Sequence, residues 1–221
     1  MAQSFDVVTF DCYGTLIDWE SGMTQAFAEA SAVDGVQLDT RDILRVLFEA
    51  RPATEYQTYR ARLTDAALRV GDRLGWRISR ERAAFFPESV ARWQPFPDTN
   101  PALERLRDAG YVLGILSNVD DDLLAGTLRH FTVPFEFTVT AQQVRSYKPG
   151  LAHFRAGRER VAGRRWLHAA QSYIHDVAPC AQLGIPVAWI NRKGETAPAR
   201  PGREFGTLNE LADWLAPEQP R

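Results

Sequence analysis

Hydrophobic and polar positions divide this chain into strand-like and helix-like stretches. Residues 5–10 are mostly apolar, and the run ends at Asp11 and turns through Gly14. Such a run predicts a strand that is buried on both faces. From about residue 18 to residue 93 the apolar positions recur at helical spacing in four stripes, which predicts an all-helical unit. Pro87 falls in the fourth stripe and is expected to break or kink that helix.

Strands and helices alternate in the rest of the chain. An Asn-Pro pair beginning at Asn100 and a terminal Gly110 predict the two ends of one helix. Thr207 and Glu210, at the spacing of a capping box, predict the start of the last helix. The predicted strands are residues 112–116, 135–140, 171–174 and 187–190.

This alternation predicts an α/β fold with a parallel, doubly wound sheet. We expect a Rossmann-like core made of residues 1–17 and 94–221, with a helical cap, residues 18–93, inserted after the first strand. Ligands bind at the carboxyl edge of such sheets. A cap inserted there would overhang that edge and exclude water from Asp11.

Composition narrows the classes of function. The 221 residues suit one sizeable domain or one domain with an insertion, and a 45% apolar fraction is enough for a full core. A formal net charge of -2 argues against a nucleic-acid partner. Cys12 and Cys180 form neither a metal pattern nor a disulfide framework. No leader and no membrane-spanning run is recognised, so we expect a cytoplasmic protein without a membrane partner.

Polar groups collect where the predicted strands end. Alone, each has an ordinary explanation, because Ser, Thr and Asp often cap helices and Lys is usually a surface charge. Together, at successive ends of one sheet, they predict an active site. In chain order they are Asp11 with Thr15, Ser117 with Asn118, Lys148, and Asp176.

The chemistry of these groups fits covalent catalysis. An ionised Asp11 is a competent nucleophile. Lys148 nearby would favour that charged form, and Thr15 could donate a hydrogen bond to the same carboxylate. Ser117 and Asn118 offer hydroxyl and amide donors for a substrate anion.

The motifs resemble those of the haloacid dehalogenase superfamily, most of all its two-haloacid dehalogenases and their dehalogenase-like relatives. The resemblance lies in Asp11-Cys-Tyr-Gly-Thr15-Leu, Leu-Ser117-Asn118, Lys148-Pro and His-Asp176, and in the place of the cap. It implies a hydrolase resembling (S)-2-haloacid dehalogenase, in which Asp11 displaces halide from carbon 2 of a 2-halocarboxylate. Water then opens the aspartyl ester to give a 2-hydroxy acid, and in-line attack inverts carbon 2.

Tyr13 favours this reaction over phosphate-ester hydrolysis. The phosphatases of the superfamily typically carry a second Asp two residues after the nucleophile, where it protonates a departing alkoxide. A phenol with a pKa of about 10 is a poor proton donor near neutrality, whereas halide leaves without a proton. Displacement at carbon also makes less demand for a metal, so no cofactor is expected. Tyr13 is instead expected to line the substrate pocket with Ser117 and Asn118.

Two other functions stay open. One is a phosphatase that uses Mg²⁺ bound by Asp11, the Tyr13 carbonyl and Asp176. The other is a non-catalytic binding or scaffold protein, against which the retention of the strand-end residues argues. The expected partner is a small carboxylate substrate. A homodimer is also considered, because members of the family often dimerise.

Several positions depart from the family pattern. Characterised dehalogenases usually have Ser-Ser-Asn where this chain has Gln171-Ser172-Tyr173, and a Tyr where it has Phe154. Ser172 and His175 are further site candidates, since an imidazole exchanges protons near physiological pH and could assist the water that opens the ester. His175 could equally be a structural residue, which is the interpretation we favour. A cap arginine usually helps to receive the halide, and the candidates are Arg45, Arg51, Arg60 and Arg62.

Overall fold

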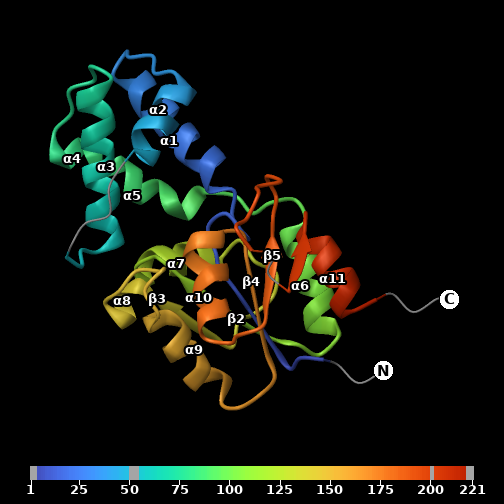
Figure 1. Ribbon diagram of the computed structural model, residues 1–221. Coiled ribbons are helices and arrows are strands. Elements are labelled where there is room, and N and C mark those ends of the chain that lie inside the picture. The colour runs from blue at the N-terminus through green and yellow to red at the C-terminus, as the bar shows by residue number, and fades with distance from the viewer. Residues whose placement is uncertain (1–3, 50–54, 200–201, 218–221) are drawn as a thin grey trace. The chain divides into compact units, whose positions relative to one another are not determined.

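The computed structural model describes residues 4–49, 55–199 and 202–217, which form two compact units (Figure 1). The core unit combines the chain up to Ile17, the segment Pro95–Asn118 and the chain from His130 onward. The helical unit combines Asp18–Gln94 with the segment Val119–Arg129.

Six parallel strands form the sheet of the core unit, in the order β3-β2-β1-β4-β5-β6. The chain first adds two strands on one side of β1 and then three on the other, which is the doubly wound α/β arrangement that the sequence predicted. All six carboxyl ends share one edge of the sheet. The strands are β1 (Val7–Phe10), β2 (Val112–Ser117), β3 (Phe137–Thr140), β4 (Trp166–Ala170), β5 (Val187–Ile190) and β6 (Arg203–Phe205).

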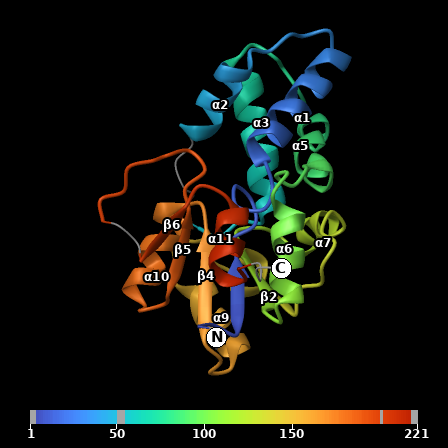
Figure 2. The same ribbon diagram turned by 90° about the vertical axis from the view of Figure 1, so that its right-hand side faces the viewer.

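Helices cover both faces of this sheet. Helices α6 and α11 lie on one face, and α9 and α10 lie on the other (Figures 1 and 2). On the second face Leu116, Phe154 and Trp166 belong to one buried apolar cluster. The helices of the core unit are α6 (Thr99–Asp108), α8 (Ala141–Val144), α9 (Ala152–Val161), the π-helical turn η2 (Tyr173–Val177), α10 (Ala178–Gln182) and α11 (Leu208–Leu215).

The helical unit packs around aromatic side chains. The rings of Phe27 and Phe86 lie 4.8 Å apart between centroids, and Trp93 is fully buried. Gly22 makes room for this tryptophan, because a Cβ at Gly22 would lie 2.4 Å from Trp93 Cγ. The helices of this unit are α1 (Trp19–Val33), α2 (Thr40–Phe48), α3 (Tyr59–Arg73), α4 (Arg80–Ala83), α5 (Phe85–Ser89), the 3₁₀ turn η1 (Val90–Arg92) and α7 (Asp121–Leu128).

The residues of the predicted fourth helical stripe form two short helices, α4 and α5, instead of one continuous helix. Helix α4 ends at Ala83 and α5 starts at Phe85, two residues before Pro87. Proline has no N–H for the backbone ladder of the preceding turn, so the break expected near Pro87 is confirmed.

The segment Val119–Arg129 lies in the helical unit, whereas the sequence analysis assigned all of residues 94–221 to the core. Its Asp120 carboxylate accepts hydrogen bonds from the backbone N–H groups of Tyr59 (2.9 Å) and Arg60 (2.8 Å) at the start of α3. These first-turn N–H groups have no partner within a helix, and a carboxylate there is favourable. A contact between residues so distant in sequence leaves no local pattern.

Two local expectations were wrong. No strand forms at the predicted residues 171–174. The strand lies earlier, at Trp166–Ala170 (β4), and the chain after Ser172 turns helical. Asn100 does not cap α6 but lies inside it, where its side chain donates to the carbonyl of His130 (2.9 Å). By contrast, Gly110 follows α6 with φ +86°, a conformation that favours glycine, and the Thr207 side chain caps α11 as predicted.

No helix within the described ranges is long and apolar enough to cross a membrane.

Candidate active site

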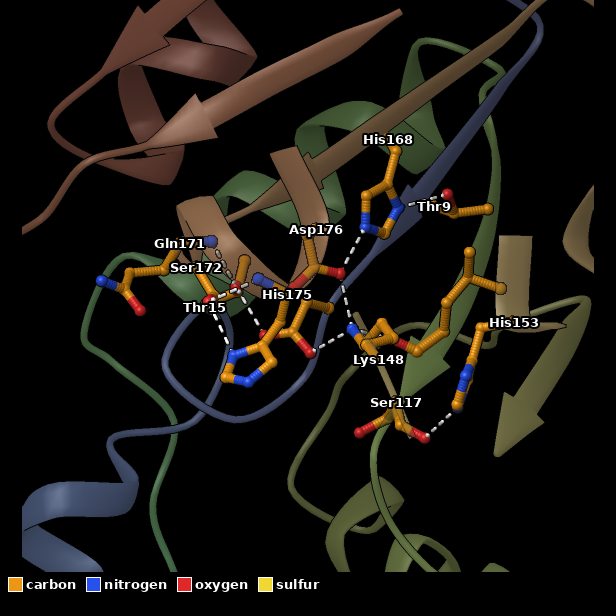
Figure 3. A network of polar contacts seen from close by, with 12 residues as sticks. Thr9, Thr15, Ser117, Lys148, His153, His168, Gln171, Ser172, His175 and Asp176 are labelled. Atoms are coloured by element: carbon orange, nitrogen blue, oxygen red, sulfur yellow. Dashed lines mark hydrogen bonds and ion pairs between the residues drawn. The ribbon is translucent and has the colours of Figure 1, made fainter. Parts of the chain in front are cut away.

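The residues predicted at strand ends meet at the carboxyl edge of the core sheet (Figure 3). Asp11 lies one residue beyond β1, and Ser117 is the last residue of β2. Lys148 lies in the loop between α8 and α9, and Asp176 lies on η2 rather than at the end of a strand. All four are buried, and Lys148 is only 3% exposed. A buried lysine needs partners, because an unpaired charge away from water is costly.

The ammonium group of Lys148 joins the two carboxylates. Its Nζ donates to Asp11 Oδ1 (2.8 Å), to Asp176 Oδ1 (2.6 Å) and to the carbonyl of Leu116 (2.9 Å). An ammonium has three donors, so every donor of Lys148 is used. The side chain is therefore held between Asp11 and Asp176.

Thr15 orients the other oxygen of Asp11. Its Oγ1 donates to Asp11 Oδ2 (3.0 Å) and accepts from the backbone N–H of Gln171 (2.9 Å). Since that N–H can only donate, the Thr15 proton is directed toward Asp11. Each carboxylate oxygen of Asp11 thus accepts one hydrogen bond, as the sequence analysis expected for Lys148 and Thr15.

Asn118 holds the backbone of Lys148. Its Oδ1 accepts from Lys148 N (2.7 Å), and its Nδ2 donates to Lys148 O (3.1 Å). This double contact fixes the loop that carries the ammonium. The predicted substrate donor thus makes a positioning contact, and its second Nδ2 proton is left for another acceptor.

The buried groups of the cluster shift one another's pKa values in different directions. Burial raises the pKa of Asp11 above its ordinary value; Lys148 opposes this and Asp176 adds to it. Burial acts on Asp176 too, but Lys148 and the hydrogen bond from His168 lower its pKa to about 2. Burial alone would lower the pKa of Lys148, yet the two carboxylates raise it above its ordinary value. A proton taken up by this cluster on acidification therefore goes to Asp11 first.

Two buried oxygens of the site have no hydrogen-bond partner within the described part of the chain. They are Ser117 Oγ and Asp176 Oδ2. A buried polar atom is usually satisfied, so each unpartnered oxygen needs an explanation. The Ser117 hydroxyl is of the type expected to donate to a substrate.

The candidates Ser172 and His175 form a local pair. Ser172 Oγ lies 2.9 Å from His175 Nδ1 and accepts from His175 N at 3.2 Å. Ser172 thereby caps η2, and His175 is exposed. Tyr13 is half-buried and forms a backbone bridge with Ile17. These contacts give His175 a structural partner and leave its ring accessible.

The arginines considered for halide binding have different surroundings. Arg45 pairs with Asp42 (2.7 Å) on α2, and Arg60 pairs with Asp122 (2.5 Å) on α7. Both guanidinium groups are thus engaged by carboxylates of the helical unit. Arg51 lies outside the described residues.

The space between Asp11 Oδ1 and Asp176 Oδ1 is not open to a divalent cation. Lys148 Nζ occupies that space at 2.8 Å and 2.6 Å from one oxygen of each carboxylate. A cation there would meet the ammonium charge and lose Asp176 Oδ1, which already accepts two hydrogen bonds. Across the described ranges, no group of three His, Cys, Asp or Glu side chains could hold a metal ion.

Sequence analysis missed two buried histidines next to the site. His168 Nε2 lies 3.0 Å from Asp176 Oδ1, and its Nδ1 lies 2.8 Å from Thr9 Oγ1. His153 Nε2 lies 3.1 Å from the carbonyl of Ser117. Burial lowers the pKa of His153 to about 4, and Lys148 adds to this, so the ring is neutral near neutral pH. For His168, the signal in the sequence is a single polar residue inside a run of core residues, whereas no such run surrounds His153.

Comparisons with known proteins identify the family of this chain. A family model of haloacid dehalogenase-like hydrolases matches residues 5–173. The (S)-2-haloacid dehalogenase H-109 of Pseudomonas putida is 26% identical over 222 residues, which cover 96% of this chain and 99% of that protein.

Two solved structures share the fold. The L-2-haloacid dehalogenase of Xanthobacter autotrophicus has a TM-score of 0.77 at 21% identity, covering 94% of this chain and 97% of that one. A protein from Bacillus subtilis classed with the HAD hydrolases, solved with bound magnesium, has a TM-score of 0.81 at 16% identity, covering 96% and 98%. These likenesses show the fold alone. The family match spans more than half of the sequence, and the chain belongs to the haloacid dehalogenase-like hydrolases.

Proposed function

We propose that this protein hydrolyses the carbon–halogen bond of a short (S)-2-halocarboxylic acid, with Asp11 as the nucleophile. The observation that carries the proposal is Lys148, which donates to Asp11 Oδ1 and Asp176 Oδ1 together. This contact favours a charged, oriented carboxylate. The 26% identical relative named as an (S)-2-haloacid dehalogenase supports the same substrate class.

The first step forms an ester. A carboxylate oxygen of Asp11 attacks carbon 2 of the substrate in line with the carbon–halogen bond, and the bonding electrons leave with the halide. Thr15 and Lys148 hold the carboxylate with one hydrogen bond on each oxygen. Fixing the nucleophile in this way reduces the entropy lost on reaching the transition state.

The second step restores Asp11. Water attacks the ester carbonyl of Asp11, and the carbon-2 oxygen leaves as the hydroxyl of a 2-hydroxy acid. The water contributes one oxygen to the Asp11 carboxylate, one proton to the product hydroxyl and one proton to the solvent. Lys148 remains beside that carboxylate and stabilises negative charge that develops on it.

Substrate recognition requires donors for a carboxylate anion. We assign this role to the Ser117 hydroxyl, which is buried without a hydrogen bond to any described residue, and to the second amide proton of Asn118. Tyr13 is assigned to the wall of the same pocket. Such donors are needed because the Asp11, Asp176 and Lys148 side chains carry an excess of negative charge when both carboxylates are ionised.

A panel of substrates tests the proposal. Purified protein is given the two enantiomers of 2-chloropropionate, and chloride and proton release are measured together, with and without a chelator. We expect one chloride and one proton per turnover from the (S) enantiomer, unchanged by the chelator. Phosphate release from p-nitrophenyl phosphate that the chelator abolishes, without chloride release, would support the phosphatase and overturn the proposal.

The variant Asp11→Asn is the matched control. It keeps the size of the side chain and removes the charged nucleophile, so chloride release is expected to fall by at least about 10³-fold. Chloride release at the wild-type rate from Asp11→Asn would remove Asp11 from the reaction. A homodimer and a cytoplasmic location stay predictions; light scattering of the purified protein tests the first, and fractionation of cells tests the second.

A further inference from the structure

Asp176 is held from its other side by a polar chain that no step above uses. His168 lies on β4 directly opposite Thr9 on β1, because the two residues are partners in the sheet register. Both side chains are fully buried. Figure 3 shows His168 between Thr9 and Asp176, and Asp176 between His168 and Lys148.

The direction of the hydrogen bonds in this chain follows from its two ends, an indole that can only donate and a carboxylate that can only accept. The indole N–H of Trp166 donates to Thr9 Oγ1 (2.7 Å), and an indole nitrogen cannot accept. At the other end of the chain, the ionised Asp176 Oδ1 can only accept, so His168 Nε2, 3.0 Å away, donates to it. Thr9 Oγ1 then donates its own proton to His168 Nδ1 at 2.8 Å. A neutral imidazole whose Nδ1 accepts must carry its proton on Nε2, which faces Asp176 Oδ1 at 3.0 Å.

We propose that Trp166, Thr9 and His168 form a positioning chain that fixes His168 as the Nε2–H tautomer and thereby holds Asp176 as the ionised partner of Lys148. His168 touches no substrate in this assignment. It acts through Asp176 on Lys148, and through Lys148 on Asp11. The kinetic part of this inference rests on the proposed function, and the tautomer does not.

Other titratable groups surround Asp176, and they must be considered in any pH measurement. Lys148 and Asp11 face it from two loops, His153 from α9 and Cys180 from α10. The carboxylate of Asp11 and the ammonium of Lys148 belong to the site itself. His153 bonds to the carbonyl of Ser117 instead of to Asp176. Among the described residues, Lys148 and His168 are thus the side chains that donate to Asp176 Oδ1.

Two substitutions at His168 separate positioning from packing. His168→Gln keeps a side-chain N–H near the place of Nε2, whereas His168→Leu keeps bulk and removes the donor. We expect His168→Leu to lower kcat by about tenfold to a hundredfold with little change in KM. The acid limb of the pH profile, which Asp11 sets, is expected to move upward, because the Asp176 charge that raises the pKa of Asp11 is no longer offset by His168. His168→Gln is expected to recover most of kcat and the wild-type limb. Equal losses in both variants with an unmoved limb would overturn the inference.

The tautomer gives a test that needs no turnover. Protein labelled with ¹⁵N in histidine is examined by NMR near neutral pH, and the His168 signals are assigned by their loss in His168→Gln. We expect Nε2 protonated and Nδ1 unprotonated in the wild type, and a loss of this pure state in Thr9→Val but not in Thr9→Ser. A wild-type His168 protonated on Nδ1 would overturn the inference. Absence of chloride release with the expected tautomer would count against the proposed function alone.

Discussion

Two ion pairs with nearly the same geometry occupy very different surroundings in the two units. In the core unit, Lys148 Nζ lies 2.8 Å from Asp11 Oδ1, and these side chains are 1% and 10% exposed. In the helical unit, Arg80 lies 2.7 Å from Asp65 Oδ1, and these side chains are 63% and 38% exposed. By distance alone, the two ion pairs would be judged equally strong. Water solvates and screens the exposed pair, whereas the buried charges depend on one another.

The difference concerns function more than stability. Burying two charges costs desolvation free energy that their mutual attraction only partly offsets, so a buried ion pair stabilises a fold poorly. It is an effective way to hold a carboxylate charged, oriented and away from competing water. The core unit has such a cluster at the carboxyl edge of its sheet, where chemistry in this fold occurs. Around Arg80 the same kind of contact has no comparable consequence.

The largest effect is expected from Lys148→Met. This change leaves Asp11 and Asp176 buried without the ammonium that both contact. We expect a loss of about 3–5 kcal/mol in the free energy of unfolding, measured with urea, and a loss of chloride release. The double variant Lys148→Met, Asp176→Asn removes one stranded charge and should recover part of the stability. A loss below about 1 kcal/mol in Lys148→Met would contradict the account.

Lowering the pH is expected to reduce activity before it reduces the free energy of unfolding. The pKa of Asp11 is raised, so its reactive form is lost at a higher pH than for an ordinary aspartate. That same proton favours the folded state, which binds it more readily than the unfolded chain does. Asp176, with its pKa lowered to about 2, stabilises the fold above about pH 4 and loses this contribution as pH falls toward 2. We expect the kcat/KM profile to fall before the unfolding free energy does; coincident midpoints would refute this order.

A smaller effect is expected from Ser117→Ala. The Ser117 hydroxyl is buried without a hydrogen bond within the described residues, so its removal should change the unfolding free energy by less than about 1 kcal/mol. If the hydroxyl donates to the substrate, KM for (S)-2-chloropropionate should rise by about tenfold. Kinetics and urea unfolding on the same preparation measure both quantities. A large loss of stability with unchanged KM would assign the hydroxyl to the fold.

The smallest effect is expected from Arg80→Ala. It breaks a 2.7 Å ion pair on the surface of the helical unit. The unfolding free energy is expected to change by less than about 1 kcal/mol, and chloride release should stay at the wild-type rate. A loss comparable to that of Lys148→Met would show that burial does not separate the two pairs.

The site residues that could be predicted from the sequence are those that follow a recognisable local pattern. Asp11, Ser117 and Asn118 directly follow apolar runs, so their place at the sheet edge follows from the strand pattern alone. The strand at Trp166–Ala170 was missed because His168 interrupts its apolar run, while Tyr173 and Ile174 favour a strand by propensity. The Ser172 cap turns that later segment into η2 instead.

Other features depend on contacts between distant residues. Thr9 and His168 meet only because β1 and β4 are neighbours in register, and neither residue alone indicates the other. Likewise, Asp120 joins α7 to the start of α3 through a carboxylate that would pass in sequence for an ordinary helix cap. Such pairings need the fold before they can be recognised. They include the contact between Thr9 and His168, the residue that faces Asp176 in the site.

Isotope transfer to Asp11 tests the central claim most directly. The enzyme, in excess over (S)-2-chloropropionate, completes one turnover in water enriched in ¹⁸O, and mass spectrometry follows the peptide that carries Asp11 and the product. The account predicts ¹⁸O in Asp11 and an unlabelled hydroxyl in the 2-hydroxy acid, because water opens the ester at the aspartyl carbonyl. A labelled product with unlabelled Asp11 would mean that water attacks the substrate directly and would contradict the account.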